Sequence, residues 1–208
     1  MLASGHHHLV QVELHKLRPT QITVGYAEVV QKRIEWAGMP KKARRGRLES
    51  HCFPAALGPR QRYYVVDHHH LGLALHEEGV ELVNVMVLED LSYLALPIFW
   101  RVMEQRRWAH PYDQSGERRD CEAMPAKLEQ LIDDPYRSLA GFLRAAGGYA
   151  KDASPFAEFM WADHLRQHIT LEQIAASMDA AVRASLVLAR SPQARYLPGW
   201  SGQSPPTT

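Results

Sequence analysis

The stretch "RYYVVDHHHLGLAL" (residues 62–75) joins two kinds of pattern in a few residues. Its first five residues are aromatic or β-branched except for Arg62, a composition typical of a β-strand. From the histidines onward the pattern is helical, and Gly79 ends it. The sequence therefore predicts a strand that turns directly into a helix, with Asp67 and three consecutive histidines at the junction.

The segments around this junction predict an α+β half. Apolar residues alternate over residues 9–14, which predicts a half-buried strand, and recur at helical spacing from Val24 until the glycine and proline near residue 40. The segment "CFPAAL" favours a short strand. The segment 82–90 is apolar on both faces except for Asn84, as expected of a strand inside a layered core.

The second half of the chain reads as helical. Four segments have a proline close to their start, which is typical of a first helical turn, and we expect helices there: 97–108, 125–134, 135–148 and 154–169. Thr170 and Gln173 form a capping box that begins a last helix. We therefore expect an α+β core over residues 1–95, a helical half over 96–190 packed with it, and a mobile proline-rich tail over 191–208.

Composition limits the classes of function. The chain of 208 residues is 46% hydrophobic and 23% charged with a formal net charge of +1, which is ordinary for a globular protein and excludes a globally basic nucleic-acid coat. Cys52 and Cys121 form no CxxC motif, so neither a disulfide framework nor a thiolate zinc site is indicated. No leader peptide or membrane span is apparent, and we expect a cytoplasmic protein. We assign no role in the fold to His6, His7 and His8.

Helical geometry argues against a metal site in the histidine run. Ligands on a helix stand at positions i and i+4, whereas residues 73 and 74 are leucine and alanine. His76 lies seven residues after His69, about 10 Å along the axis. A metal ion would therefore need ligands from elsewhere in the chain.

The position of the run favours an anion site. If Asp67 is the N-cap, then His68, His69 and His70 occupy the first helical turn, where backbone N–H groups are unpaired and the helix dipole is positive. Imidazoles there can donate to phosphate oxygens or exchange protons near neutral pH. The alternative is that Asp67 only caps the helix and the histidines are exposed. Both readings stay open on physical grounds.

A family resemblance bears on this choice. "YYVVDHHHLGLAL" resembles the element of the ParB/sulfiredoxin superfamily in which a strand is followed by D-G-H-H-R and a helix. The upstream "LRPTQITVG" and the downstream "DDPYRSLAGFLRAAGGYAK" and "PFAEFMWAD" look like segments of the ParB-like nuclease family. The resemblance spans roughly residues 9–169. It implies a small mixed sheet with helices, in which the helix N-terminus holds phosphates.

The resemblance transfers residue by residue, with two departures. Asp67, His69 and His70 match the family's aspartate and histidines, whereas His68 replaces a glycine and Leu71 replaces an arginine that contacts phosphate. Candidates to supply the missing charge are Arg18, Arg60, Arg62 and the basic segment 41–47. We expect that segment, "KKARRGR", to be an exposed loop that is either solvated or in contact with nucleic acid.

The implied function is phosphate chemistry. The first hypothesis is a nuclease or nucleotide hydrolase that acts on DNA or on a nucleotide such as ATP or ADP, with Mg²⁺ as cofactor. The second is a nucleotide- or DNA-binding regulator without turnover, like the partition proteins of the superfamily. A free amino acid kinase is disfavoured, because Gln21 stands where such kinases have a glutamate base. Sulfiredoxin activity is disfavoured, because no cysteine lies in the histidine region. A second copy of the chain is a further candidate partner.

These hypotheses assign roles to particular residues. The expected catalytic residues are His69, His70 and Glu28, the carboxylate nearest to Gln21. The expected Mg²⁺ ligands are Asp133 and Asp134, which could equally be a helix cap and a surface charge. The expected phosphate-binding residues are Asp67, His68, Arg18, Gln21, Lys151 and Arg137.

Overall fold

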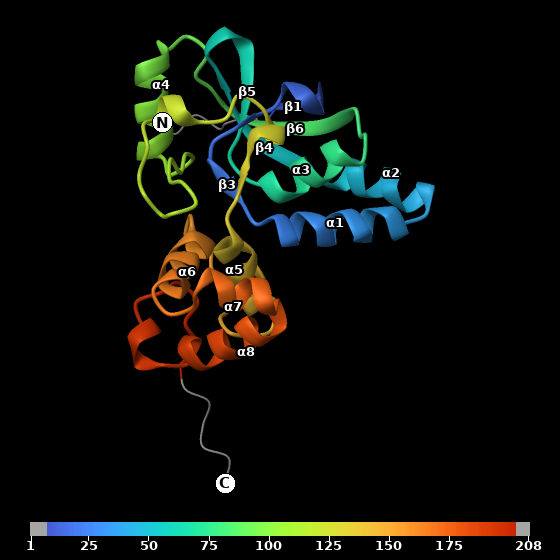
Figure 1. Ribbon diagram of the computed structural model, residues 1–208. Coiled ribbons are helices and arrows are strands. Elements are labelled where there is room, and N and C mark those ends of the chain that lie inside the picture. The colour runs from blue at the N-terminus through green and yellow to red at the C-terminus, as the bar shows by residue number, and fades with distance from the viewer. Residues whose placement is uncertain (1–7, 203–208) are drawn as a thin grey trace. The chain divides into compact units, whose positions relative to one another are not determined.

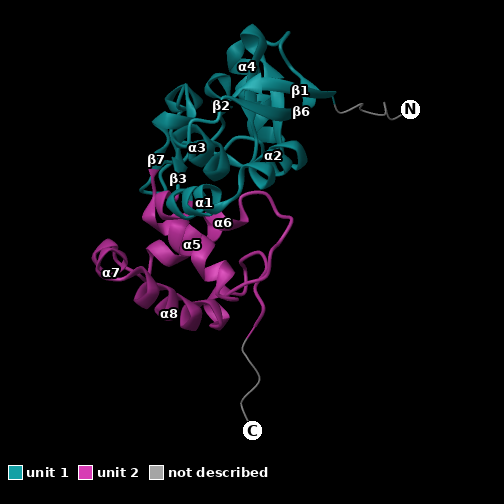
Figure 2. Cartoon of the chain, turned by 90° about the vertical axis from the view of Figure 1, so that its right-hand side faces the viewer, with its two compact units in different colours: residues 1–24, 29–132 teal, residues 25–28, 133–208 magenta. Residues whose placement is uncertain are grey.

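The computed structural model describes residues 8–202, which form two compact units. Within the described residues, unit 1 comprises 8–24 and 29–132, and unit 2 comprises 25–28 and 133–202 (Figure 2). No helix in this range is long and apolar enough to cross a membrane. Each unit has its own core and is described by itself.

A mixed sheet forms the centre of unit 1 (Figure 1). Its order is β1-β6-β4-β5-β2, where β1 pairs antiparallel with β6, β4 antiparallel with β5, and β4 parallel with β6. The strands are β1 (His8–Glu13), β2 (Arg18–Pro19), β4 (Cys52–Gly58), β5 (Arg62–Val65) and β6 (Leu82–Asp90). Two short strands, β3 (Thr23–Val24) and β7 (Ile132–Asp133), make a separate pair. The predicted α+β fold is confirmed.

Helices cover both faces of this sheet. On one face, α3 (His69–Glu77) and α1 (Tyr26–Gly38) contribute Leu73 and Trp36 to a core that also contains Val65 of β5. On the other face, α4 (Leu96–Gln105) packs Phe99 against Tyr64, with the ring centroids 4.5 Å apart. Val65 and Tyr64 are neighbours in sequence that point to opposite faces, as the period of a strand requires.

Unit 2 is a helical cluster around an aromatic pair. Tyr149 stacks on Trp161 with centroids 4.3 Å apart, and Leu139, Leu143 and Leu165 are fully buried beside them. Its helices are α5 (Pro135–Ala145), α6 (Ala157–Arg166), α7 (Leu171–Ala176) and α8 (Met178–Ala189). The predicted capping box of Thr170 and Gln173 is confirmed at the start of α7. The last helix is interrupted at Ser177, whose side chain caps α8.

Two predictions of local structure were wrong. The basic segment 41–47 is not a loop but the first part of α2 (Lys41–Ser50), because Arg44 binds the carbonyl oxygens of Ala37 and Met39 and Leu48 packs against the core. The segment 125–134 is not a helix. It contains one 3-10 turn (Leu128–Gln130) and ends in strand β7, which pairs with β3.

The division between the units also differs from the expected one. It falls at Ile132 and not near residue 95, because α4 packs on the sheet of unit 1. Within the expected tail, a 3-10 turn (Pro192–Ala194) is followed by Leu197, which is 3% exposed in the core of unit 2. Residues 203–208, like His6 and His7, lie outside the described residues.

Candidate functional site

Helix α3 begins without a side-chain cap among the described residues. His68, not Asp67, is the N-cap residue, and its backbone is left-handed with φ 68° and ψ 24°. The Asp67 Oδ1 accepts the His68 N–H at 2.6 Å, which corrects the prediction that Asp67 caps the helix. A left-handed residue favours glycine, which is the residue that the ParB-like pattern has at this position. The replacement by His68 therefore carries backbone strain.

His69 is a buried residue that fixes a neighbouring loop. It is 4% exposed, and its Nε2 accepts the backbone N–H of Thr20 at 3.1 Å. The Thr20 hydroxyl in turn donates to the carbonyl oxygen of Val65 at 2.7 Å. An accepting Nε2 carries no proton, so the neutral His69 ring holds its proton on Nδ1. His69 thereby links the start of α3 to the loop after β2.

The ring of His68 has two basic residues, Lys32 and His51, among its neighbours. The His51 ring lies 6.4 Å from it and the Phe53 ring 5.9 Å, both between centroids. Burial lowers the pKa of His68, and electrostatic interaction with His51 and Lys32 lowers it further, against the opposing effect of Asp67. The ring is therefore neutral at pH 7 and lies among groups that attract anions.

Sequence reasoning missed Lys32 and His51. Lys32 lies on α1, and His51 follows α2 directly before β4. No spacing in the sequence relates either of them to His68, because packing of the helices on the sheet brings them together. A lone histidine or lysine gives no signal of its own.

The other expected residues of unit 1 have mostly local roles. The Arg18 guanidinium donates to the carbonyl oxygen of Ala126, and its pKa is lowered by burial and by the charge of Arg62. Gln21 is 7% exposed, and its amide donates to the carbonyl oxygen of Thr23 at 2.6 Å. His70 is half-buried on α3. Arg18 and Arg62 are thus like-charged neighbours.

The two expected metal ligands cap helices in unit 2. Asp133 Oδ1 accepts the N–H of Tyr26 at 2.8 Å, at the start of α1. Asp134 accepts the N–H of Tyr136 at 3.0 Å as the N-cap of α5, and its Oδ2 pairs with Arg166 at 2.7 Å. No group of three or more potential ligands for a metal ion occurs in residues 8–202. These aspartates do not fit a shared cation site, and Mg²⁺ stays an untested expectation.

Glu28 and Arg137 lie together in unit 2. Arg137 is 3% exposed, its guanidinium carbon is 3.5 Å from the centroid of the Phe159 ring, and its Nη2 is 3.5 Å from Glu158. Burial lowers the pKa of Arg137 to about 10, against the opposing charge of Glu28. The Glu28 carboxylate lies against Gly141, where a Cβ would overlap with it. Lys151 of the same unit is exposed.

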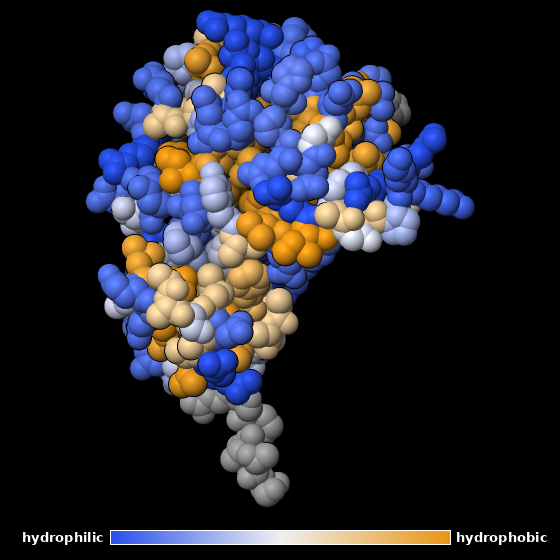
Figure 3. Space-filling model, turned by 45° about the vertical axis from the view of Figure 1, so that its right-hand side comes forward, coloured by the Kyte–Doolittle hydropathy of each residue, from blue (hydrophilic) through white to orange (hydrophobic). Residues whose placement is uncertain are grey.

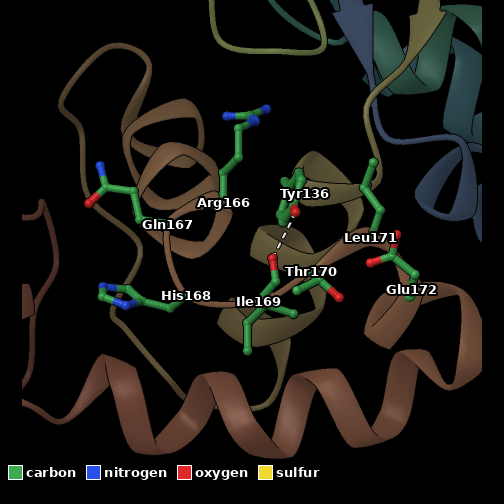
Figure 4. A pocket seen from close by; sticks show the side chains of 8 residues that line it. All are labelled: Tyr136, Arg166, Gln167, His168, Ile169, Thr170, Leu171 and Glu172. Atoms are coloured by element: carbon green, nitrogen blue, oxygen red, sulfur yellow. Dashed lines mark hydrogen bonds between the residues drawn. The ribbon is translucent and has the colours of Figure 1, made fainter.

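The expected site residues are therefore divided between the units. Unit 1 holds the residues around α3, and unit 2 holds the others: Glu28, Asp133, Asp134, Arg137 and Lys151. A pocket of about 380 Å³ in unit 2 contains none of the expected residues (Figure 4). Its Tyr136 hydroxyl donates to the carbonyl oxygen of Ile169, and its Arg166 pairs with Asp134 and Asp163. Tyr136 and Arg166 thus already serve the packing of unit 2.

Comparison with known proteins agrees with the resemblance seen in the sequence. A family model described as "Putative ParB-like nuclease" matches residues 10–167. The crystal structure of protein Atu1540 from Agrobacterium tumefaciens matches with a TM-score of 0.89 and 45% sequence identity, over 95% of this chain and 98% of that one. No curated protein matches the chain.

Proposed function

Because the chain belongs to the ParB-like nuclease family, we propose that it binds the phosphate groups of nucleic acid or of a nucleotide at the start of α3 and hydrolyses them there. One observation carries the proposal: the basic residues Lys32 and His51 are neighbours of His68, at a helix N-terminus that has no side-chain cap within residues 8–202. The dipole of a helix N-terminus and basic side chains beside it together attract anions.

The histidines take different roles in this proposal. The lowered pKa of His68 keeps its ring neutral, so that it can accept a proton from a water molecule that attacks phosphorus. The phosphorus–oxygen bond to the leaving group then breaks. His69 positions the loop that contains Thr20, and His70 is the candidate to orient the phosphate. Arg18 and Arg62 are candidates to supply the positive charge that other family members have in an arginine at the position of Leu71.

Binding can be tested with the whole protein and labelled ATP, ADP and single-stranded DNA. The double variant Lys32→Ala/His51→Ala should weaken binding by about fivefold or more, since loss of the Lys32 charge alone removes roughly 1 kcal/mol of attraction. The matched control is Lys16→Ala/His15→Ala, which removes the same residue types from an exposed cluster around Glu13. Equal affinities of the two double variants would contradict the proposal.

A non-catalytic regulator is the second candidate. It is favoured by the engagement of the His69 Nε2 with a backbone N–H, which removes that nitrogen from proton transfer. Assays of plasmid cleavage and nucleotide hydrolysis, each with and without Mg²⁺, separate the two candidates. Turnover that His68→Gln abolishes supports the hydrolase. Binding without turnover supports the regulator.

A further inference from the structure

Helix α2 concentrates positive charge in a chain that is nearly neutral. Glu49 is its only carboxylate, and it pairs with Arg45 at 2.9 Å. The formal net charge of the whole chain is +1. Hydrophilic residues project at the right-hand edge of the space-filling view, where α1 ends and α2 begins (Figure 3). The basic residues of α2 are Lys41, Lys42, Arg44, Arg45 and Arg47.

The sequence of α2 is poorly suited to a helix that only needs to be stable. Lys41 and Lys42 stand in the first turn, where the positive end of the helix dipole repels them. Gly46 lies in the helix interior at a cost of about 1 kcal/mol relative to alanine. A Cβ on Gly46 would meet nothing within 4 Å, so packing does not require the glycine. α2, which the structure describes in full, has no buried residue.

One side of α2 contacts the rest of unit 1, and the other side is exposed to solvent. Arg44 binds two carbonyl oxygens at the end of α1 and lies 5.6 Å from the Trp36 ring centroid. Leu48 packs on the core, and its carbonyl oxygen accepts from Asn84 at 3.1 Å. Successive helical residues are rotated by about 100°. The residues Lys41, Lys42, Arg45 and Gly46 of α2 are exposed, and together they are called the outward face here. Lys42 and Gly46 lie opposite the inward side of Arg44 and Leu48, whereas Lys41 and Arg45 lie along its edge.

We propose that this face of α2 is a docking surface for the phosphate backbone of double-stranded nucleic acid. The inference rests on the proposed function, which identifies the ligand as a phosphate compound. It adds that the ligand is a nucleic-acid duplex and that the duplex contacts a second surface, outside the α3 site. Lys41 and Arg45 are one turn apart, about 6 Å along the axis. That spacing allows them to meet separate phosphates. Gly46, without a side chain, lets the nucleic-acid backbone approach closely.

Two other partners fit α2 less well. An anionic membrane binds helices that have a broad apolar face, whereas Leu48 of α2 packs inward and Ala43 is small. Single-stranded nucleic acid needs aromatic residues to stack its bases, and α2 contains none. Duplex phosphates need only exposed positive charge, which this face supplies.

The test compares two triple variants of the whole protein. Lys41→Gln/Lys42→Gln/Arg45→Gln removes the positive charge of the outward face while keeping helix propensity. The control Lys16→Gln/Arg101→Gln/Lys127→Gln removes the same charge from exposed positions elsewhere in unit 1. Binding of a fluorescent DNA duplex is measured by anisotropy over a range of salt concentrations. Circular dichroism checks that both variants are folded.

We expect the α2 variant to bind the duplex at least tenfold more weakly than the control variant. The slope of log affinity against log salt concentration should become shallower by about 0.9 for each phosphate that the variant no longer neutralises. Gly46→Glu, which has room for its side chain, should weaken duplex binding as well. Binding of ATP at the α3 site should stay unchanged in both cases.

The outcomes separate the two proposals. Equal duplex affinity and salt dependence of the α2 and control variants overturn the docking surface. The docking surface is also overturned if the protein binds vesicles of anionic phospholipid more tightly than it binds the duplex. ATP binding without duplex binding refutes the docking surface alone, whereas duplex binding that depends on α2 without any ATP binding refutes only the α3 site.

Discussion

Two helices of this chain begin shortly after a strand and an aspartate, and they begin in different ways. At the start of α5, Asp134 is 2% exposed, accepts the Tyr136 N–H and pairs with Arg166. At the start of α3, Asp67 is exposed, and its side chain accepts the N–H of the adjacent His68 and caps no N–H of the helix within the described residues. The α5 start is closed by protein groups. The α3 start has no side-chain cap within residues 8–202.

This difference shows why the aspartates could not be told apart in the sequence. An aspartate before an apolar helical pattern predicts a cap in both places. At α5 burial makes that cap necessary, because an unpaired N–H there would have no water to bind. At α3 the left-handed backbone of His68 moves the helix start by one residue, so the side chain of Asp67 no longer reaches the helix. Four measurements test this contrast.

The largest effect is expected from Asp134→Ala. The substitution removes the cap of α5 and leaves the mostly buried Arg166 without one of its carboxylate partners, at a cost of about 3 kcal/mol in the free energy of unfolding. Urea denaturation followed by tryptophan fluorescence measures this cost, since Trp161 lies in the same core. Asp163→Ala is the control, because this exposed carboxylate also pairs with Arg166. A similar loss from both variants would show that Arg166 and not the cap dominates.

Relief of strain at the α3 start should give the next largest effect. His68→Gly removes the left-handed penalty and should raise the free energy of unfolding by about 1 kcal/mol. His68→Ala keeps a Cβ at the same backbone angles and serves as the control, because it removes the ring without removing the strain. If both variants lose stability equally, packing of the ring on Phe53 outweighs the backbone strain.

Sequence reasoning found the elements whose pattern is set by local burial. The alternation around Val10 and Val12 gave β1, and the D-H-H motif located the start of α3. It failed for α2, because a helix without buried residues has no apolar period to detect. It also grouped Glu28 with the histidines, whereas the first turn of α1 belongs to unit 2. Lys32 and His51 were missed because only the packing of distant segments makes them neighbours.

The pH dependence of stability should distinguish the two helix starts. The pKa of His68 is lower in the folded protein than its usual value near 6.5, so the unfolded chain binds more protons below that pH. Stability is then present above about pH 6.5 and is lost as the pH falls toward the folded pKa, by at most about 1.4 kcal/mol per pH unit for each such group. His68→Gln should reduce the slope of the melting temperature between pH 7 and 5.

Two variants complete this measurement. His164→Gln should reduce the slope in the same direction, because burial and the neighbouring His168 also lower the pKa of His164. Asp134→Asn should not reduce this slope, because a raised carboxyl pKa changes stability with pH in the opposite direction. Burial raises the pKa of Asp134 from its usual value near 4, so its contribution to stability changes chiefly as the pH rises from the carboxyl range. A slope that His68→Gln does not reduce would mean that this ring titrates alike in both states.

The smallest effect on stability is expected from Asp67→Ala, the counterpart of Asp134→Ala. Asp67 is exposed and caps no helical turn, so the free energy of unfolding should change by less than about 0.5 kcal/mol. Its carboxylate is the negative group that opposes Lys32 and His51 at His68, and removing it should strengthen ATP binding a few-fold. A stable variant with tighter binding identifies the α3 start as an anion site. A variant that binds ATP more weakly instead assigns Asp67 a direct part in holding the ligand.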